Sequence, residues 1–363
     1  MATLPEMVDL TLSGYLHILG QARGGREEGQ QIMAVLVTGG AGYIGSHMVL
    51  ELVDAGESVV VIDNLSTGFR WAVHPNAELV VGDIGNQDLV RSVVRKHNVD
   101  AIIHFAGSIV VPESVADPLG YYSNNTVKSR SLMEVAVTTG VRNFIFSSTA
   151  AVYGNPKHNP VGEDAAPAPM SPYGSSKLMT EIMLADTANA HDLRYVALRY
   201  FNVAGADPQG RSGQSTPRAT HLIKVACETA LGQRPRMDVF GTDYDTIDGT
   251  CVRDYIHVRD LARAHSAALA HLRKGGGSEI FNCGYSQGYS VLQVIDAVKR
   301  VSGVDFEARL APRRAGDPAA IVAKSDKIRA ALGWKPELDN LDLIVKHALT
   351  WERQLGEKLR HSA

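Results

Sequence analysis

From Met33 onward, the chain alternates short apolar runs with amphipathic stretches of helical length, separated by glycine or polar turns. This rhythm is typical of repeated strand–helix–strand units that build a parallel sheet. The apolar runs carry valine and isoleucine at consecutive positions, as strands covered by helices on both faces must. Six strands are predicted, over residues 34–38, 58–62, 77–82, 100–105, 143–148 and 194–199.

The segments between these strands indicate the fold class. Four of them have helical length and end near glycine, asparagine or histidine, namely residues 43–56, 87–98, 117–140 and 172–191. The sequence therefore predicts an α/β fold with a Rossmann-like, doubly wound parallel sheet, whose ligands bind at the carboxyl ends of the strands.

The rhythm changes twice along the chain. After about residue 200, shorter elements with Gly- and Pro-bearing turns predict a smaller C-terminal lobe over residues 201–363, with some segments returning to the main sheet of residues 33–200. Residues 1–32 have mixed character and end in QARGGREEGQQ. We expect these residues to be a mobile extension; the alternative is an interaction arm with one short helix in TLSGYLHIL.

Composition excludes several classes of function. The 36 basic residues are scattered among 39 acidic ones, so no basic stripe predicts a nucleic acid partner. Cys227, Cys251 and Cys283 are too far apart for a disulfide framework or a zinc pair, and we predict no metal site. No apolar run approaches the roughly 18 residues of a membrane span, and no secretion signal is present. A cytoplasmic protein without a membrane partner is expected.

A glycine pattern follows the first strand. The run VTGGAGYIG places Gly39, Gly42 and Gly45 between that strand and the next helix, where a tight turn and a pyrophosphate leave no room for Cβ atoms. Asp63 ends the second strand, and a carboxylate there accepts hydrogen bonds from an adenosine ribose and repels a 2′-phosphate. This context favours NAD over NADP.

A second cluster predicts acid–base chemistry. In SPYGSSK, Tyr173 and Lys177 are four residues apart and share one helix face. Tyrosine is a poor base at its ordinary pKa of about 10, but an adjacent cation favours the phenolate. The strand before this helix ends in the hydroxyls of Ser147, Ser148 and Thr149, which can bond the substrate oxygen and the tyrosine.

Six motifs in order, GGAGYIG, FAG, SSTAAVYG, SPYGSSK, RYFN and VRDYIHV, resemble the extended short-chain dehydrogenase/reductases, and among them the UDP-galactose 4-epimerases. The resemblance runs from Met33 nearly to the end. It implies a homodimer that interconverts UDP-glucose and UDP-galactose with bound NAD. Tyr173 then takes the proton of the sugar 4-hydroxyl, Lys177 binds the nicotinamide ribose, and Thr149 with Ser148 supplies the catalytic hydroxyls.

The same resemblance implies two sets of contacts. Residues 33–200 then form the NAD-binding domain, and residues 201–363 mostly form the UDP-sugar lobe. In that lobe, Arg253 and Arg314 suit a diphosphate because a guanidinium bonds two oxygens at once. The residues expected to contact NAD are Gly39, Gly42, Tyr43, Ile44, Gly45, Asp63, Asn64, Asp83, Ile84, Phe105, Ala106, Gly107, Asn125, Tyr173, Lys177 and Tyr200. Those expected to contact the UDP sugar are Thr149, Tyr173, Asn202, His221, Leu222, Phe240, Arg253, Tyr255, Arg314, Asp317 and Ile321.

Departures from the family pattern leave alternatives open. Ile109 replaces a cofactor-contacting lysine, and Ile321, beside the sugar 2-substituent, lies between the tyrosine that excludes N-acetyl groups and the small residues that admit them. Ala150 and Ala151 replace the acid and base of 4,6-dehydratases, which disfavours that activity. An epimerase or decarboxylase of UDP-glucuronate or UDP-N-acetylglucosamine, and a non-catalytic NAD-binding scaffold, are the other hypotheses.

Overall fold

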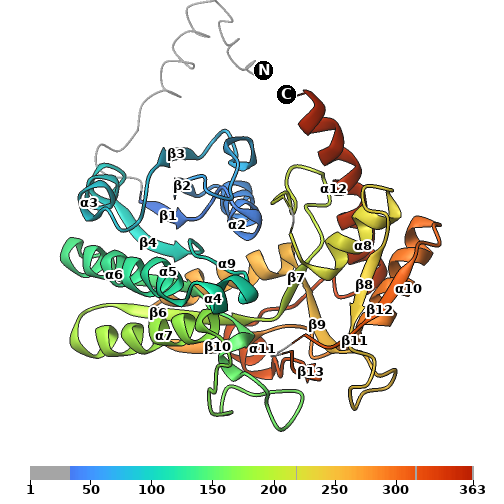
Figure 1. Ribbon diagram of the computed structural model, residues 1–363. Coiled ribbons are helices and arrows are strands. Elements are labelled where there is room, and N and C mark those ends of the chain that lie inside the picture. Colours follow the sequence, from blue (N-terminus) through green and yellow to red (C-terminus); the bar gives the residue numbers. More distant parts are fainter. Residues whose placement is uncertain (1–32, 218, 315–316, 362–363) are drawn as a thin grey trace, which may run out of the picture. The chain divides into compact units, whose positions relative to one another are not determined.

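A seven-stranded parallel sheet forms the centre of the computed structural model, which describes residues 33–217, 219–314 and 317–361 (Figure 1). The extension expected over residues 1–32 lies outside the described residues. The strand order is β10-β6-β5-β4-β1-β2-β3. These strands are β1 (Ala34–Thr38), β2 (Ser58–Asp63), β3 (Glu78–Val81), β4 (Val99–His104), β5 (Asn143–Ser147), β6 (Arg194–Tyr200) and β10 (Glu279–Cys283).

The predicted α/β class is confirmed, and each of the six predicted strands ends within one residue of its predicted bounds. The rhythm of the sequence does not predict β10, which pairs in parallel with β6 at the edge of the sheet. The sheet reverses its winding between β1 and β4, where a doubly wound fold binds its ligands.

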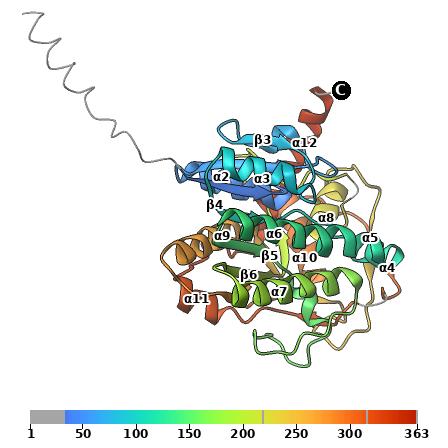
Figure 2. The same ribbon diagram turned by 90° about the vertical axis from the view of Figure 1, so that its left-hand side faces the viewer.

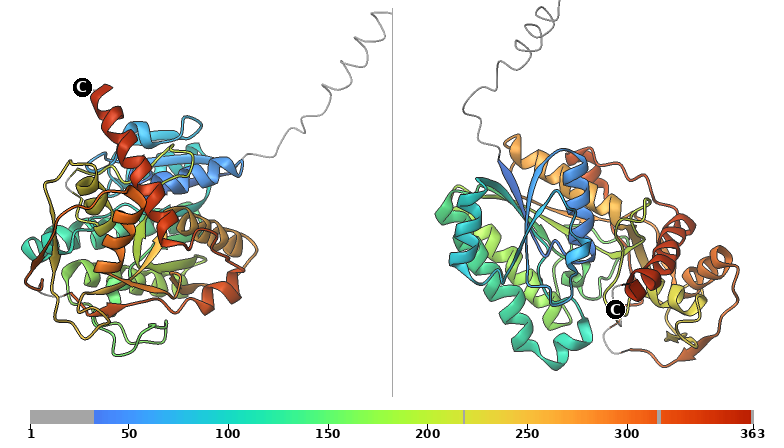
Figure 3. Two further views of the ribbon diagram at one scale, coloured as in Figure 1. Left: turned by 90° about the vertical axis from the view of Figure 1, so that its right-hand side faces the viewer. Right: turned by 90° about the horizontal axis from the view of Figure 1, so that it is seen from above.

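Alternate side chains of β1 enter two different apolar layers. Val35 and Val37 pack in a cluster with Met48 of one helix and Leu261 of another, whereas Leu36 packs in the cluster on the opposite face. Figures 2 and 3 show the strands between these two helical layers. One layer contains α2 (Tyr43–Asp54) and α9 (Val258–Arg273), and the other α3 (Gln87–Lys96), α6 (Lys128–Thr139) and α7 (Pro172–Ala190).

The segment expected as one helix over residues 117–140 is divided in the structure. It consists of α5 (Pro118–Tyr121), a π-helix η2 (Tyr122–Val127) and α6, after the short α4 (Val111–Ala116). A π-helical turn is rare and often marks a functional site, because it changes the direction of side chains within a helix.

A second group of elements follows β6. Strands β11, β9 and β13 form a small sheet in that order, and β7 also pairs with β9. The register pairs Asn202 with Tyr255 and Ile321 with Arg253, so four predicted substrate residues lie on neighbouring strands. The bounds are β7 (Asn202–Ala204), β9 (Val252–His257), β11 (Gly288–Ser290) and β13 (Ala320–Ile321).

Helices α8, α10 and α12 pack together beside this small sheet (Figure 1). Within the described residues, no helix combines the length and the apolar character that crossing a membrane requires. The remaining elements are η1 (Arg70–Ala72), η3 (Ala150–Tyr153), α8 (Leu222–Ala230), β8 (Met237–Phe240), α10 (Val291–Ser302), β12 (Ala308–Ala311), α11 (Asp326–Leu332) and α12 (Leu341–His361).

Replacing Gly45 by alanine should destabilise the fold. A Cβ on Gly45 would lie 2.1 Å from the carbonyl oxygen of Gly39, a backbone atom that cannot move without opening the turn. We expect Gly45→Ala to lower the free energy of unfolding by about 1–3 kcal/mol, as overpacking typically does. Gly277→Ala is the control, because a Cβ there meets no atom within 4 Å. Equal urea midpoints for both variants would contradict this account.

Candidate active site

The site begins where β5 ends and α7 starts. The chain leaves β5 through Ser148 and Thr149, and Thr149 caps the short helix η3 by accepting a hydrogen bond from Ala151 N at 3.1 Å. Ser171 caps α7 by accepting from Gly174 N at 3.2 Å, with Pro172 in the first turn. This start brings the first turns of α7 to the carboxyl edge of the sheet.

Tyr173 lies buried in the first turn of α7 and is hydrogen-bonded to Thr149. Burial raises the pKa of the Tyr173 phenol, and the bond to Thr149 acts in the opposite direction. The phenolate of a tyrosine beside a threonine hydroxyl can receive a proton from a substrate hydroxyl held by the same threonine. The structure therefore brings together two of the predicted catalytic residues.

Lys177 lies one turn later on the same face and is also buried. Its Nζ donates to the Ser147 carbonyl oxygen at 3.0 Å and lies 4.9 Å from the centroid of the Phe146 ring. Burial lowers the pKa of Lys177 to about 8, and the charge of Glu181 opposes this shift. Within the described residues no hydrogen bond joins Lys177 to the Tyr173 hydroxyl.

The π-helix carries Asn125 into the site. Its Oδ1 accepts from Ser108 N at 2.7 Å, and its Nδ2 donates to the Ser108 carbonyl at 2.9 Å and to Ser176 Oγ at 3.0 Å. A Cβ on Gly107 would lie 3.0 Å from Asn125 Oδ1 and 3.6 Å from Lys177 Nζ. The loop after β4 is thus tied to α7, and Gly107 leaves open the space beside Lys177.

His104, which the sequence analysis did not identify, connects β1 to the helix that follows Asn125. Its Nδ1 lies 2.7 Å from Thr38 Oγ1 and its Nε2 lies 2.8 Å from Ser129 Oγ. Ser129 Oγ in turn donates to the Asn125 carbonyl at 2.5 Å. Burial, together with the charge of Lys177, lowers the pKa of His104 from 6.5 to about 3, so the ring is neutral at physiological pH.

The three successive hydroxyls have different partners, which the sequence did not predict. Ser147 Oγ donates to the Tyr200 hydroxyl at 3.1 Å, whereas Ser148 Oγ donates to Glu181 Oε1 at 2.5 Å. Ser148 is fully buried, so its hydroxyl supports α7 instead of facing a substrate beside Thr149. The partner Glu181 lies 33 positions later in the chain and belongs to no local motif that could have identified it.

The glycine turn forms a cradle that fits the diphosphate of a dinucleotide. A Cβ on Gly39, which has φ of 72°, would lie 2.6 Å from Ala106 N. Gly42 is the N-cap of α2 and brings no side-chain acceptor, and the first turn has no acidic residue, so the positive end of the helix dipole is unopposed. A cavity of about 190 Å³ opens there, lined in part by Thr67 and Ser215.

Asp63 links β2 to the glycine turn. Its carboxylate accepts from Ala41 N at 2.9 Å and from Leu65 N at 2.8 Å, which holds it at the carboxyl edge of the sheet. The next residue, Asn64, accepts from Ser66 N at 3.0 Å. Asp63, predicted to bind the ribose, and Asn64, predicted to contact the cofactor, therefore lie at the end of β2, beside the cradle.

The other residues predicted for the cofactor surround the same edge. Asp83 pairs with Lys128 Nζ at 2.5 Å. Burial raises the pKa of the Asp83 carboxyl, but hydrogen bonds from Lys128 and Gly85 outweigh this effect, so the pKa lies below its ordinary range. Its neighbour Ile84 is buried among apolar residues. The Phe105 ring packs 4.8 Å from His265, and Ala106 and Ile44 are partly buried close to the glycine turn.

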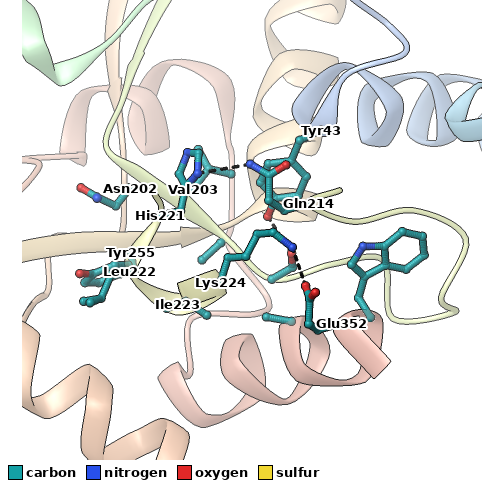
Figure 4. Close-up of a pocket in the computed structure, with 14 residues that line it drawn as sticks. Tyr43, Asn202, Val203, Gln214, His221, Leu222, Ile223, Lys224, Tyr255 and Glu352 are labelled. Carbon is teal, nitrogen blue, oxygen red and sulfur yellow. Dashed lines mark hydrogen bonds and ion pairs between the residues drawn. The ribbon is translucent and has the colours of Figure 1, made fainter. Parts of the chain in front are cut away.

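A cavity of about 470 Å³ collects several residues predicted for substrate (Figure 4). Asn202, His221, Leu222 and Tyr255 line it, and Tyr43 reaches it from α2. The Tyr43 hydroxyl donates to the Gly205 carbonyl at 2.7 Å, and His221 Nδ1 lies 3.3 Å from Gln214 Nε2. The cavity is separate from the group around Tyr173, whose residues do not line it.

The predicted diphosphate residues form pairs outside that cavity. Arg253 Nη2 lies 3.8 Å from Asp317 Oδ1, and the Arg314 guanidinium lies 3.8 Å from the centroid of the Phe240 ring. Ile321 pairs with Arg253 across two strands and is buried. No group of three or more metal-ligating side chains occurs within the described ranges.

Known proteins resemble this chain over most of its length. The model of the NAD-dependent epimerase/dehydratase family matches residues 35–284. A UDP-glucose 4-epimerase of Azospirillum brasilense is 59% identical over 325 residues, which are 90% of this chain and 93% of the relative.

Two solved structures resemble this fold. The crystal structure of UDP-glucose 4-epimerase from Brucella ovis in complex with NAD has a TM-score of 0.85 and 45% identity, covering 88% of this chain and 98% of that one. The UDP-Glc/GlcNAc 4-epimerase of Campylobacter jejuni has a TM-score of 0.78 and 48% identity, covering 89% and 99%.

The buried His104 should make stability depend on pH. Its folded pKa is about 3 and its ordinary value is 6.5, so the unfolded chain takes up a proton as the pH falls through this window and the folded protein does not. His104→Gln keeps a polar side chain but does not titrate. Between pH 7 and 5, we expect the free energy of unfolding of the unsubstituted protein to fall by about 2 kcal/mol more than that of the His104→Gln variant.

Urea unfolding at pH 7, 6 and 5 measures this difference. The buried His47 and His265, whose pKa values burial lowers to about 4, stay in both proteins, so their contributions cancel. An equally steep loss of stability in the two proteins would show that His104 is not held neutral.

Proposed function

This chain belongs to the NAD-dependent epimerase/dehydratase family, and we propose that it interconverts UDP-galactose and UDP-glucose as an NAD-dependent 4-epimerase. The observation that carries the proposal is the buried group of Tyr173, Lys177 and Thr149 beside a glycine cradle of the right shape for a dinucleotide. Relatives of this chain with the same named activity include one solved with NAD.

The residues that hold NAD are those around the carboxyl edge. Gly39, Gly42 and Gly45 leave room for the diphosphate. Asp63 would accept hydrogen bonds from the adenosine ribose, and Lys177 would donate to the nicotinamide ribose. When bound, NAD would supply the acceptor and the donor of the hydride that leaves sugar carbon 4 and returns to it.

Tyr173 moves the proton. It takes the proton of the sugar 4-hydroxyl as the hydride leaves carbon 4, and it returns that proton to the oxygen of the turned 4-keto sugar. Thr149, bonded to Tyr173, holds the same oxygen. Because burial raises the pKa of Tyr173, the phenolate depends on positive charge in the site, which the Lys177 ammonium provides.

The residues proposed to bind NAD and those proposed to bind the substrate lie mostly in different parts of the chain. Residues 33–200 bind NAD, and residues 201–363 mostly bind the UDP part of the substrate, with Arg253 and Arg314 at the diphosphate. Among the described residues, the long-range partner of Arg253 is the Asp317 carboxylate at 3.8 Å and that of Arg314 is the Phe240 ring, which leaves donors for phosphate oxygens.

The physiological sugar has a second candidate. The Campylobacter jejuni relative acts on both UDP-Glc and UDP-GlcNAc, and Ile321 is smaller than a tyrosine at the place beside the sugar 2-substituent. Activity on a UDP sugar that carries an N-acetyl group is therefore the alternative substrate range that these observations support. Retention of Tyr173, Lys177 and Thr149 in one buried group speaks against a scaffold without activity.

We also propose a homodimer in the cytoplasm. Adjacent elements from α4 to α7 expose apolar side chains that a second copy would cover, namely Val115, Leu119, Val127, Met179 and Ile182. Cys227, Cys251 and Cys283 are free and buried, which suits a reducing compartment.

Removing the Tyr173 hydroxyl should abolish most of the activity. We expect Tyr173→Phe to lower kcat for UDP-galactose by about 10²–10⁴-fold, the range of general acid–base catalysis, and to leave bound NAD in place. Tyr195→Phe is the matched control, because Tyr195 lies at the amino end of β6 among apolar residues. Unchanged turnover in Tyr173→Phe would remove this residue from the mechanism.

A larger side chain at position 321 should change the substrate range. Ile321 packs among Tyr153, Val161 and Phe201, so Ile321→Tyr must extend toward the sugar. We expect turnover of UDP-N-acetylglucosamine to fall about 10-fold more than turnover of UDP-galactose. An equal loss on both substrates would mean that this position does not read the 2-substituent.

A further inference from the structure

A buried ion pair lies close to the catalytic group of Tyr173, Lys177 and Thr149. Glu181 on α7 and Arg199 on β6 are joined by hydrogen bonds of 2.6, 3.0 and 3.2 Å, and their side chains are only 2% and 5% exposed. Burying two charges costs several kcal/mol in desolvation, which the attraction between them only partly offsets. Such a pair by itself is weak evidence for stability.

The ion pair joins the two segments that carry the catalytic side chains. Glu181 lies one turn beyond Lys177 on α7, and its Oε1 accepts from Ser148 Oγ at 2.5 Å. Ser148 directly precedes Thr149, and its own amide donates to the Leu198 carbonyl of β6 at 2.9 Å. The carboxylate of Glu181 is thus the point at which α7, the end of β5 and β6 meet.

The same network continues into the C-terminal elements. Arg199 Nη1 donates to the Tyr153 hydroxyl at 3.0 Å, and that hydroxyl donates to Asn282 Oδ1 at 2.7 Å. Asn282 Nδ2 then donates to the Val161 carbonyl at 2.8 Å, and the Val161 amide donates to the Val322 carbonyl, next to β13, at 2.8 Å. A continuous chain of bonds therefore runs from the catalytic helix to the strand that pairs with Arg253.

We propose that Glu181 and Arg199 are positioning residues for the epimerisation: they fix Tyr173 and Lys177 of α7 relative to Thr149, and they connect this group to β13 beside the substrate. The inference rests on the function proposed above. A misplacement of about 1 Å between reacting groups is enough to cost roughly 100-fold in rate, so the network acts on kcat without touching the substrate.

Charge gives the pair a second effect, on Lys177. Among the described residues, the charged and titratable groups that interact with Lys177 are Glu181 on α7 and His104 on β4, and Tyr200 on β6 interacts with Tyr173. Of these, Glu181 favours the ammonium and opposes the effect of burial on the pKa of Lys177. Removing its charge therefore moves the loss of the ammonium, and with it the alkaline fall of kcat, to lower pH.

The test compares a variant that removes one charge of the ion pair with a double variant that removes both charges. Glu181→Gln leaves Arg199 buried without its carboxylate, which destabilises the fold. The double variant Glu181→Gln/Arg199→Met removes both charges, keeps an acceptor for Ser148, and restores much of the thermal stability, as apolar replacement of buried pairs often does. Asp100→Asn is the control, because Asp100 pairs with Arg273 at the amino end of β4.

In the double variant we expect kcat for UDP-galactose to stay about 10- to 100-fold below that of the unsubstituted protein, with KM little changed and the alkaline fall at lower pH. Bound NAD should also dissociate about 10-fold faster, because Lys177 is less well held. The control should keep the kcat, the pH profile and the rate of NAD release of the unsubstituted protein.

The two proposals fail in different ways. A double variant that regains kcat, pH profile and NAD release together with its thermal midpoint would overturn the positioning role, because the pair would then be merely structural. If the unsubstituted protein does not epimerise UDP-galactose, the proposed function falls. The rate of NAD release, measured as free NAD separated from the protein at timed intervals, still decides whether Glu181 and Arg199 position Lys177.

Discussion

All catalytic geometry in this molecule depends on parallel strands that end at one edge of the sheet. Parallel strands share their direction, so the residues after β1, β4, β5 and β6 emerge side by side. They supply the glycine turn, Gly107, Thr149 and Asn202. The crossover helix α7 runs back across the sheet, and its first turns, with Tyr173 and Lys177, therefore lie at the same edge.

Burial then determines the chemistry at that edge. It raises the pKa of Tyr173, lowers that of Lys177 and keeps His104 neutral, so each group differs from its behaviour in water. Buried polar groups must be hydrogen-bonded, and here their partners come from β4, the π-helix, β5 and α7. Desolvation and rigidity are thus two results of the same packing, and both favour a site organised before the substrate binds.

The sequence predicted the parts of the fold whose signal is local. Consecutive large apolar residues mark β1, β2 and β5, and the glycine run and SPYGSSK lie on the expected elements. β10 was missed because its five residues, EIFNC, mix polar with apolar side chains. β11 and β13 were missed because strands of three and two residues carry too little pattern. The π-helix around Asn125 and the pairing of Ser148 with Glu181 depend on tertiary contacts that no neighbouring residue announces.

The proposed epimerisation requires that one hydride leaves sugar carbon 4 and returns to it without exchange with water. The most direct measurement incubates the purified protein, without added NAD, with UDP-galactose that carries deuterium at carbon 4, and follows the sugar by NMR and mass spectrometry. The account predicts UDP-glucose that keeps the deuterium at carbon 4, and NAD recovered from the denatured protein. Product in which hydrogen from water has replaced the deuterium would contradict it, because carbon 4 would then have lost a proton and not a hydride.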